Sequence, residues 1–189
     1  ELAISELGQT KYKYEVIFED DKFDSATGAT TANKLVNLDK VDAMLSFGSP
    51  VGNVVSPIAE KAKVVHFGVA SDPVVAIGTY NFNHWTPPYE ETKLMTAELV
   101  KRGIKTAILL EQNQPGVLSV TNVLKPELEA AGVKLVASEK FNTGTRDFRS
   151  IINKVKNTKA DIYLLEVTSP ELETLTKQLK EAGIKTPLT

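Results

Sequence analysis

The sequence has no cysteine, so it contains no disulfide, no thiolate nucleophile and no sulfur-ligated metal. Its two histidines, His66 and His84, support neither a zinc site nor a catalytic dyad. No apolar run approaches the roughly 20 residues that span a bilayer. The first ten residues also lack the basic and apolar regions of a signal peptide. The protein is therefore cytoplasmic, or a signal peptide has been removed from it.

A strong charge of one sign is also missing. The 22 basic and 24 acidic residues give a net charge of −2, and no Lys/Arg block is longer than two residues, so nucleic acid is not expected as a partner. There is no GxSxG elbow, Walker loop or GxGxxG loop, which argues against the commonest α/β enzymes. The acidic run 18–24 lacks the glycine and the terminal glutamate of a calcium loop. We expect no metal there and interpret Asp24 as a helix-starting residue.

What the sequence does contain is a regular alternation of strand-like and helix-like segments. With 189 residues and 42% hydrophobic content, the chain can bury a substantial core. Residues 2–7 are typical of the end of a helix, closed by Gly8. The periodicity predicts strands at 14–20, 41–47, 63–68, 105–111, 133–141 and 160–167, and helices at 25–38, 51–62, 88–102, 117–131, 147–156 and 170–182. This alternation predicts an α/β fold of parallel sheet with helices on both faces.

One segment, 79–88, breaks the alternation with aromatic and polar residues and two prolines. We interpret it as a crossing between two α/β lobes, 1–83 and 84–189. The chain starts inside a helix and stops where a next strand is expected, so the first lobe lacks its first strand and the second is incomplete. The prediction is two Rossmann-like doubly wound lobes, truncated at both ends.

Two turns at strand ends are candidates for one binding site, because ligands of open parallel sheets lie outside the carboxyl ends of the strands. In the first turn, Ser49, Gly52 and Asn53 lie at the start of a helix, whose free N–H groups and positive dipole end suit a carboxylate. In the second turn, Ala70 and Ser71 offer backbone groups and a hydroxyl. The alternative for Ser49 and Asn53 is that they only cap the helix.

Strand ends in the second half supply further candidates. Glu111, Glu166 and Thr168 should point toward the cleft if the lobes face each other, and a carboxylate there could accept an ammonium or amide group. Alternatively, the two glutamates are solvated or salt-bridged at the rim. Near the crossing, Trp85 and Tyr89 would form an apolar wall or pack the hinge.

The residues themselves resemble a known family. The most specific parts are an order of strand, Asp-Asp and helix around "YEVIFEDDKFDSATGATTANKLV", the helix "SPIAEKAKVV" leading into "GVASDP", and the block "GTRDFRSIINKVKNTKADIYLL". Over essentially its whole length, the chain resembles the type I periplasmic solute-binding proteins of the branched-chain amino acid (Leu/Ile/Val) ABC-transporter family.

The resemblance implies a fold of two lobes that close about a hinge over a small ligand, which is then delivered to the membrane permease of an ABC importer. It implies ligand contacts from the turn 49–53, from Ala70 and Ser71, from the loop 114–116 and from the strand end near Thr168. It also implies a monomer without a cofactor on the periplasmic or extracellular face, lipid-anchored or free, with its signal peptide removed.

Two segments depart from the leucine-binding pattern. Pro115 precedes Gly116 where leucine binders often have an aromatic residue, and Glu166, Val167 and Thr168 follow "YLL" where they tend to have small or aromatic residues. The resemblance therefore leaves the ligand open between an aliphatic amino acid and an amide, urea or an aromatic acid.

The leading hypothesis is a non-catalytic, exported receptor for a small carboxylate-bearing solute, with a branched-chain or other aliphatic amino acid as the first candidate ligand. The second is a ligand-sensing domain of a receptor or regulator with the same fold. The third is an α/β enzyme with Glu111 or Glu166 as acid or base.

Overall fold

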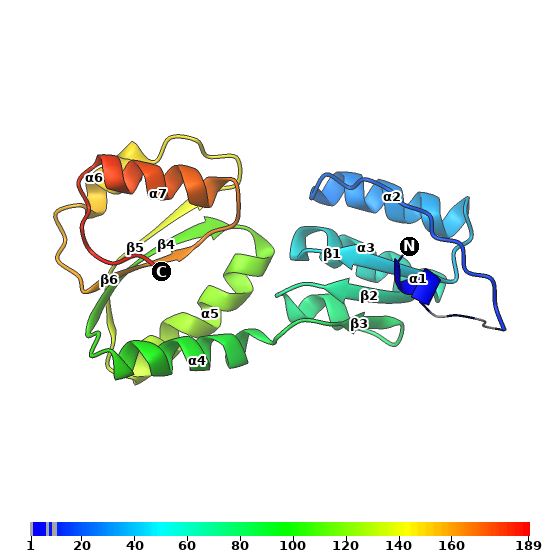
Figure 1. Ribbon diagram of the computed structural model, residues 1–189, viewed down its shortest axis with the longest axis horizontal. Coiled ribbons are helices and arrows are strands. Elements are labelled where there is room, and N and C mark those ends of the chain that lie inside the picture. Colours follow the sequence, from blue (N-terminus) through cyan, green and yellow to red (C-terminus); the bar gives the residue numbers. More distant parts are fainter. Residues whose placement is uncertain (1, 7, 9–10) are drawn as a thin grey trace.

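The computed structural model describes residues 2–6, 8 and 11–189, and its strands form two separate parallel sheets (Figure 1). The first sheet has the order β1-β2-β3 and the second the order β5-β4-β6. The strands are β1 (Ala43–Phe47), β2 (Val65–Val69), β3 (Asn81–Asn83), β4 (Thr106–Asn113), β5 (Lys134–Asn142) and β6 (Ile162–Glu166). The predicted α/β class with parallel sheets is confirmed, and the proposed boundary at 83/84 falls directly after β3.

The helices follow the predicted segments closely. They are α1 (Leu2–Glu6), α2 (Ser25–Asn37), α3 (Ser49–Ala62), the short 3-10 helix η1 (Pro73–Ala76), α4 (Pro88–Lys101), α5 (Pro115–Ala130), α6 (Arg149–Val155) and α7 (Glu171–Glu181). Gly103, Gly132 and Gly183 end α4, α5 and α7 with φ of +76°, +77° and +80°, the left-handed conformation that glycine adopts most readily. None of the described helices is both long and apolar enough to cross a membrane.

Several features of local structure differ from the prediction. The strand predicted at 14–20 is wrong, because this stretch pairs with no strand in the described part of the chain, and its Tyr14, Val16 and Phe18 are 49%, 48% and 73% exposed. The sequence reasoning missed β3 and η1, and it started α3 and α5 two residues too late. Of the helix predicted at 2–7, residue 7 lies outside the described residues.

The second sheet has helices on both faces. On one face Leu124 and Leu128 of α5 pack with Leu109 of β4 and Leu164 of β6, and Leu99 of α4 joins them. The opposite face has a core of its own, formed by α6 and α7 with Ile108, Leu110, Phe141, Phe148, Ile152, Val155, Tyr163, Leu175 and Leu179. Since α5 follows β4 onto one face and α7 follows β6 onto the other, the loops after these adjacent strands diverge. This is the topological switch point at which open α/β sheets bind ligands.

The first sheet is covered differently. Its core side packs on α2 and α3 through Ala32, Met44, Val51, Val55 and Ala59. The alternation of the strands directs four large apolar side chains away from these helices, and these four are exposed. They are Leu45 (76%), Phe47 (64%), Phe67 (46%) and Phe82 (49%), with the rings of Phe67 and Phe82 stacked 5.5 Å apart.

Candidate ligand-binding site

The two predicted turns of the first lobe are bonded to each other. Ser49 is the first residue of α3 and only 3% exposed, and its Oγ accepts a hydrogen bond from the backbone N–H of Asp72 at 3.1 Å. Asn53, one turn further along α3, donates from Nδ2 to Oδ2 of Asp72 at 2.8 Å. Neither side chain caps α3, because no side-chain hydrogen bond closes its N-terminus. The start of α3 and the turn after β2 therefore form one unit.

Asp72 is the residue on which this unit is centred, and it is not among the site residues predicted from the sequence. Besides contacting Ser49 and Asn53, its Oδ1 accepts the N–H of Val74 at 3.0 Å, so that it also starts η1. The Asp-Pro pair at 72–73 was the available signal for a turn. Its bonds to α3 depend on residues about 20 positions earlier and could not be read from that signal.

The backbone of Ala70 already has partners in the first sheet. Its N–H donates to Oδ1 of Asn83 at 3.1 Å, and its carbonyl accepts from Nδ2 of the same side chain at 2.7 Å. Asn83 lies at the end of β3 and so fixes the neighbouring turn. Ser71 comes next, half-buried, and no hydrogen-bond partner reaches its hydroxyl among the described residues. Of the two, Ser71 has the free polar group.

Gly52 lies against η1. A Cβ at this position would be 2.7 Å from Cγ2 and 3.1 Å from Cγ1 of Val75, which is completely buried. The missing side chain therefore lets α3 and η1 approach each other, which favours a packing role for this glycine.

In the second lobe, hydrogen bonds connect the segments at the ends of the three strands, next to the switch point between β4 and β6. Gln112, near the end of β4, is 1% exposed, and its Oε1 accepts hydrogen bonds from both the N–H and the hydroxyl of Thr168, at 3.0 and 2.7 Å. Its Nε2 donates to the hydroxyl of Thr143, after β5, at 3.3 Å. Gln112 thus ties three strand-end loops together. The sequence reasoning missed it, since a glutamine at the end of an apolar strand gives no local sign of such partners.

The start of α5 meets the start of α3. Gln114 caps α5 by accepting the N–H of Gly116 at 2.8 Å, and Pro115 is its exposed first residue. A Cβ on Gly116 would be 2.8 Å from Oγ of Ser49, so the two lobes touch here. Figure 1 shows this end of α5 on the side of the second lobe that faces the first lobe.

Glu111 lies inside the second lobe. It is 2% exposed, and its Oε1 is 2.7 Å from Nζ of Lys125 and 3.7 Å from Nζ of Lys140. Burial acts to raise its pKa, but the hydrogen bond from Lys125 and the charges of Lys125 and Lys140 outweigh burial, so the pKa of Glu111 is lowered. These contacts favour the salt-bridge alternative over a place in the pocket wall.

Glu166 and Trp85 lie near α4. Burial raises the pKa of Glu166, and the neighbouring charges of Glu91 and Glu111 raise it further. Trp85 is 49% exposed, and burial raises the pKa of Glu91 on α4, with Trp85 opposing the shift. Glu166 is therefore a half-buried carboxyl without a cationic partner among the described residues. No group of three or more acidic or histidine side chains in the described ranges is placed to hold a metal ion.

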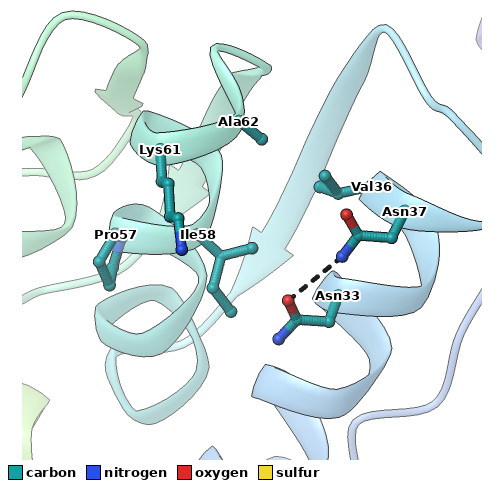
Figure 2. A pocket seen from close by; sticks show the side chains of 7 residues that line it. All are labelled: Asn33, Val36, Asn37, Pro57, Ile58, Lys61 and Ala62. Carbon is teal, nitrogen blue, oxygen red and sulfur yellow. Dashed lines mark hydrogen bonds between the residues drawn. The ribbon is translucent and has the colours of Figure 1, made fainter.

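A surface groove lies elsewhere, between α2 and α3 (Figure 2), with a volume of about 490 Å³. Asn33, Val36 and Asn37 line it from α2, and Pro57, Ile58, Lys61 and Ala62 line it from α3. These α3 residues belong to the C-terminal half of the helix, whereas the two predicted turns meet at its N-terminus. The groove therefore does not coincide with the candidate site.

The chain belongs to the periplasmic binding protein family, whose model matches residues 1–189. It is 24% identical, over an alignment of 205 residues, to a Leu/Ile/Val-binding protein homolog of Brucella abortus, covering 98% of this chain and 50% of the relative. A Leu-, Ile-, Val-, Thr- and Ala-binding protein of Pseudomonas aeruginosa is 30% identical over 80 residues, which is 42% of this chain and 21% of the relative. The resemblance to the branched-chain amino acid type is thereby confirmed.

Solved structures show the same fold. A leucine-binding protein from Thermotoga maritima superposes with a TM-score of 0.89 at 17% identity, over 99% of this chain and 55% of that one. A solute-binding protein of an ABC transporter from Rhodopseudomonas palustris, in complex with 3,4-dihydroxybenzoic acid, superposes with a TM-score of 0.87 at 22% identity. This match covers 100% of this chain and 53% of that one. The predicted type I periplasmic-binding fold is confirmed. The chain spans about half the length of the curated relatives it matches.

Proposed function

We propose that this chain carries the ligand cleft of an extracytoplasmic solute receptor that serves an ABC importer. The ligand is a small carboxylate-bearing molecule, with an aliphatic amino acid as the first choice, held between two lobes that close on it. The observation that carries the proposal is the convergence of two sets of strand-end loops at the starts of α3 and α5. The partner would be the permease of the importer.

The start of α3 suits the carboxylate. The first N–H groups of a helix have no partner within it and carry partial positive charge. No side chain caps α3. Because Oγ of Ser49 accepts from Asp72, its own proton is free to be donated to an anion. The start of α5 is already capped by Gln114, so the anionic end of the ligand belongs on α3.

The other end of the ligand would meet Thr168. Its hydroxyl donates to Gln112, which leaves the oxygen lone pairs to accept a hydrogen bond from an ammonium or amide group. Pro115, which is exposed at the start of α5, and Ser71 would complete the wall. A binding role also agrees with Glu111, which is buried in an ion pair rather than available as an acid or base.

Aromatic acids are the second ligand class. They share the carboxylate, and the Rhodopseudomonas palustris neighbour was solved with 3,4-dihydroxybenzoic acid. The amino group distinguishes the classes, because only an amino acid can donate hydrogen bonds to Thr168 from an ammonium.

The test is a thermal-unfolding screen with amino acids, amides, urea and aromatic acids, followed by far-ultraviolet circular dichroism. A ligand at 100 times its Kd stabilises by about 2.7 kcal/mol, which raises Tm by several degrees in a chain of this size. We expect leucine, isoleucine or valine to do so. Stabilisation by a neutral amide or urea, with none by any carboxylate, would contradict the proposal.

The matched variants are Ser49→Ala and Ser150→Ala. Loss of the Ser49 hydroxyl, a donor to a charged group worth about 1.5–3 kcal/mol, should weaken binding roughly 10- to 100-fold. Ser150 is exposed on α6, away from both turns, so its change should leave affinity unaltered. Equal affinities of the two variants would remove Ser49 from the site.

A further inference from the structure

The contact between Gly116 and Ser49 places the backbone of α5 directly on a side chain of α3. A Cβ on Gly116 would lie 2.8 Å from Oγ and 3.3 Å from Cβ of Ser49, and 3.3 Å from Oε1 of Gln114. Non-bonded heavy atoms are attractive at about 3.5–4.0 Å, so even a methyl group does not fit. In the observed arrangement of the lobes, this position accepts only glycine.

Nothing in α5 itself explains why residue 116 is a glycine. Gly116 is the second residue of α5, and its φ does not lie in the positive range where glycine is favoured. Alanine is a better helix former than glycine at such a position. Helix propensity alone would therefore favour a side chain at position 116, but the close approach of α3 leaves no room for it.

Neither neighbour of Gly116 is free to move aside. Oγ of Ser49 is held by the N–H of Asp72, and the whole residue is 3% exposed. Oε1 of Gln114 is held by the N–H of Gly116 itself. A side chain at 116 would have to break one of these bonds or separate the two helices.

We propose that Gly116 is a positioning residue: its bare backbone rests on Ser49, and this contact sets how closely the two lobes approach. The role of this contact in limiting how far the lobes close rests on the proposed function, whereas the contact itself does not. A larger residue at 116 would act as a wedge between the lobes.

The contact is tested with the pair Ser49→Cys and Gly116→Cys. The chain has no other cysteine, and the 3.3 Å between Cβ positions is close to the roughly 3.5–4.5 Å of disulfides. We expect an intramolecular disulfide on mild oxidation. The control pair Ser49→Cys and Asn122→Cys, with the second cysteine about 9 Å further along α5, should stay reduced. A first pair that stays reduced, or a control that oxidises equally well, would overturn the proposal.

The wedge is tested by the distance between spin labels on Lys61→Cys in α3 and Asn122→Cys in α5, both exposed positions. Adding Gly116→Ala should lengthen this distance, and further adding Ser49→Gly, which removes the opposing side chain, should restore it. An unchanged distance in the Gly116→Ala protein would refute a positioning role.

Binding is measured separately, with L-leucine as the probe. Gly116→Ala should weaken leucine binding about tenfold, as expected from overpacking by one methyl group. If leucine fails to bind the unaltered protein, the first choice of ligand is wrong, while the disulfide and the label distances still decide on the contact. If leucine binds both proteins equally, the contact does not limit closure.

Discussion

At the scale of single residues, His66 is the polar side chain that joins the strands of the first sheet. Its side chain is completely buried, with Nδ1 2.9 Å from Oδ1 of Asn81 and Nε2 2.8 Å from Oγ of Ser46. Because the amide oxygen of Asn81 only accepts, Nδ1 carries the proton and Nε2 accepts from Ser46. Burial lowers the pKa of His66, with the hydrogen bond to Asn81 opposing the shift. The ring is therefore neutral and links β1, β2 and β3.

This lowered pKa makes stability depend on pH. The unfolded chain takes up a proton near pH 6.5, whereas the folded His66 does so only at lower pH. Below about pH 6.5 the unfolded state thus binds more protons, and stability decreases as the pH falls. We expect the free energy of unfolding in urea to drop between pH 7.5 and 5.5, and the drop to be smaller in His66→Gln. The exposed His84→Gln should behave like the unaltered protein, and equal drops in all three would contradict this account.

The positions of candidate residues could be predicted from the local pattern, but their hydrogen-bond partners could not. The strand-end position and small side chains of Ser49 and Asn53 indicated the first turn, and both residues lie there. The ion pair of Glu111 and the bonds of Gln112 depend on Lys125 and Thr168, which only the fold brings near. Local pattern gives position along an element, but the chemical partner of a buried group comes from another element.

At the scale of elements, the sequence predicted helices better than short strands. The helix ends carry local signals, such as the prolines that start α4 and α5 and the glycines that follow α4, α5 and α7. β3 has three residues and exists because β2 lies beside it, with the N–H of His66 donating to the carbonyl of Tyr80. The stretch 14–20 has the composition of a strand, but no described strand pairs with it.

The packing of α3 on η1 gives a prediction at this scale. Gly52→Ala places a methyl group 2.7 Å from Cγ2 of the buried Val75, and overpacking of this kind costs about 1–3 kcal/mol. The free energy of unfolding should therefore fall, although alanine favours the helix. In a double-mutant cycle with Val75→Ala, the two changes should couple favourably, because the smaller residue makes room. Purely additive effects would show that Gly52 does not serve this packing.

At the scale of the whole molecule, the two lobes have unequal cores. Among the described residues, the second sheet is enclosed by buried clusters of nine and eight residues, whereas the first sheet has one cluster of five. Hydrophobic burial is the dominant stabilising contribution, so the first lobe should open at lower free-energy cost. The two sheets could be predicted from the alternation in sequence, but this inequality could not, because it depends on which faces are covered.

Hydrogen exchange followed by mass spectrometry measures that difference. We expect peptides of β4 and β6 to exchange more slowly than peptides of β1 and β2. A saturating carboxylate ligand should slow exchange at the starts of α3 and α5 together, since each lobe contributes one of them. Equal protection of both sheets would mean that the lobes unfold as one cooperative unit.

The exposed face of the first sheet has a practical consequence. Leu45, Phe47, Phe67 and the stacked Phe82 present an apolar surface of the kind that environment-sensitive dyes bind. Such a dye would fluoresce strongly with the folded protein, and its signal on heating would report this face as well as unfolding. The reliable probes are intrinsic ones: the far-ultraviolet circular dichroism of the helices and the emission of Trp85, the single tryptophan, which lies half-exposed in the connection between β3 and α4.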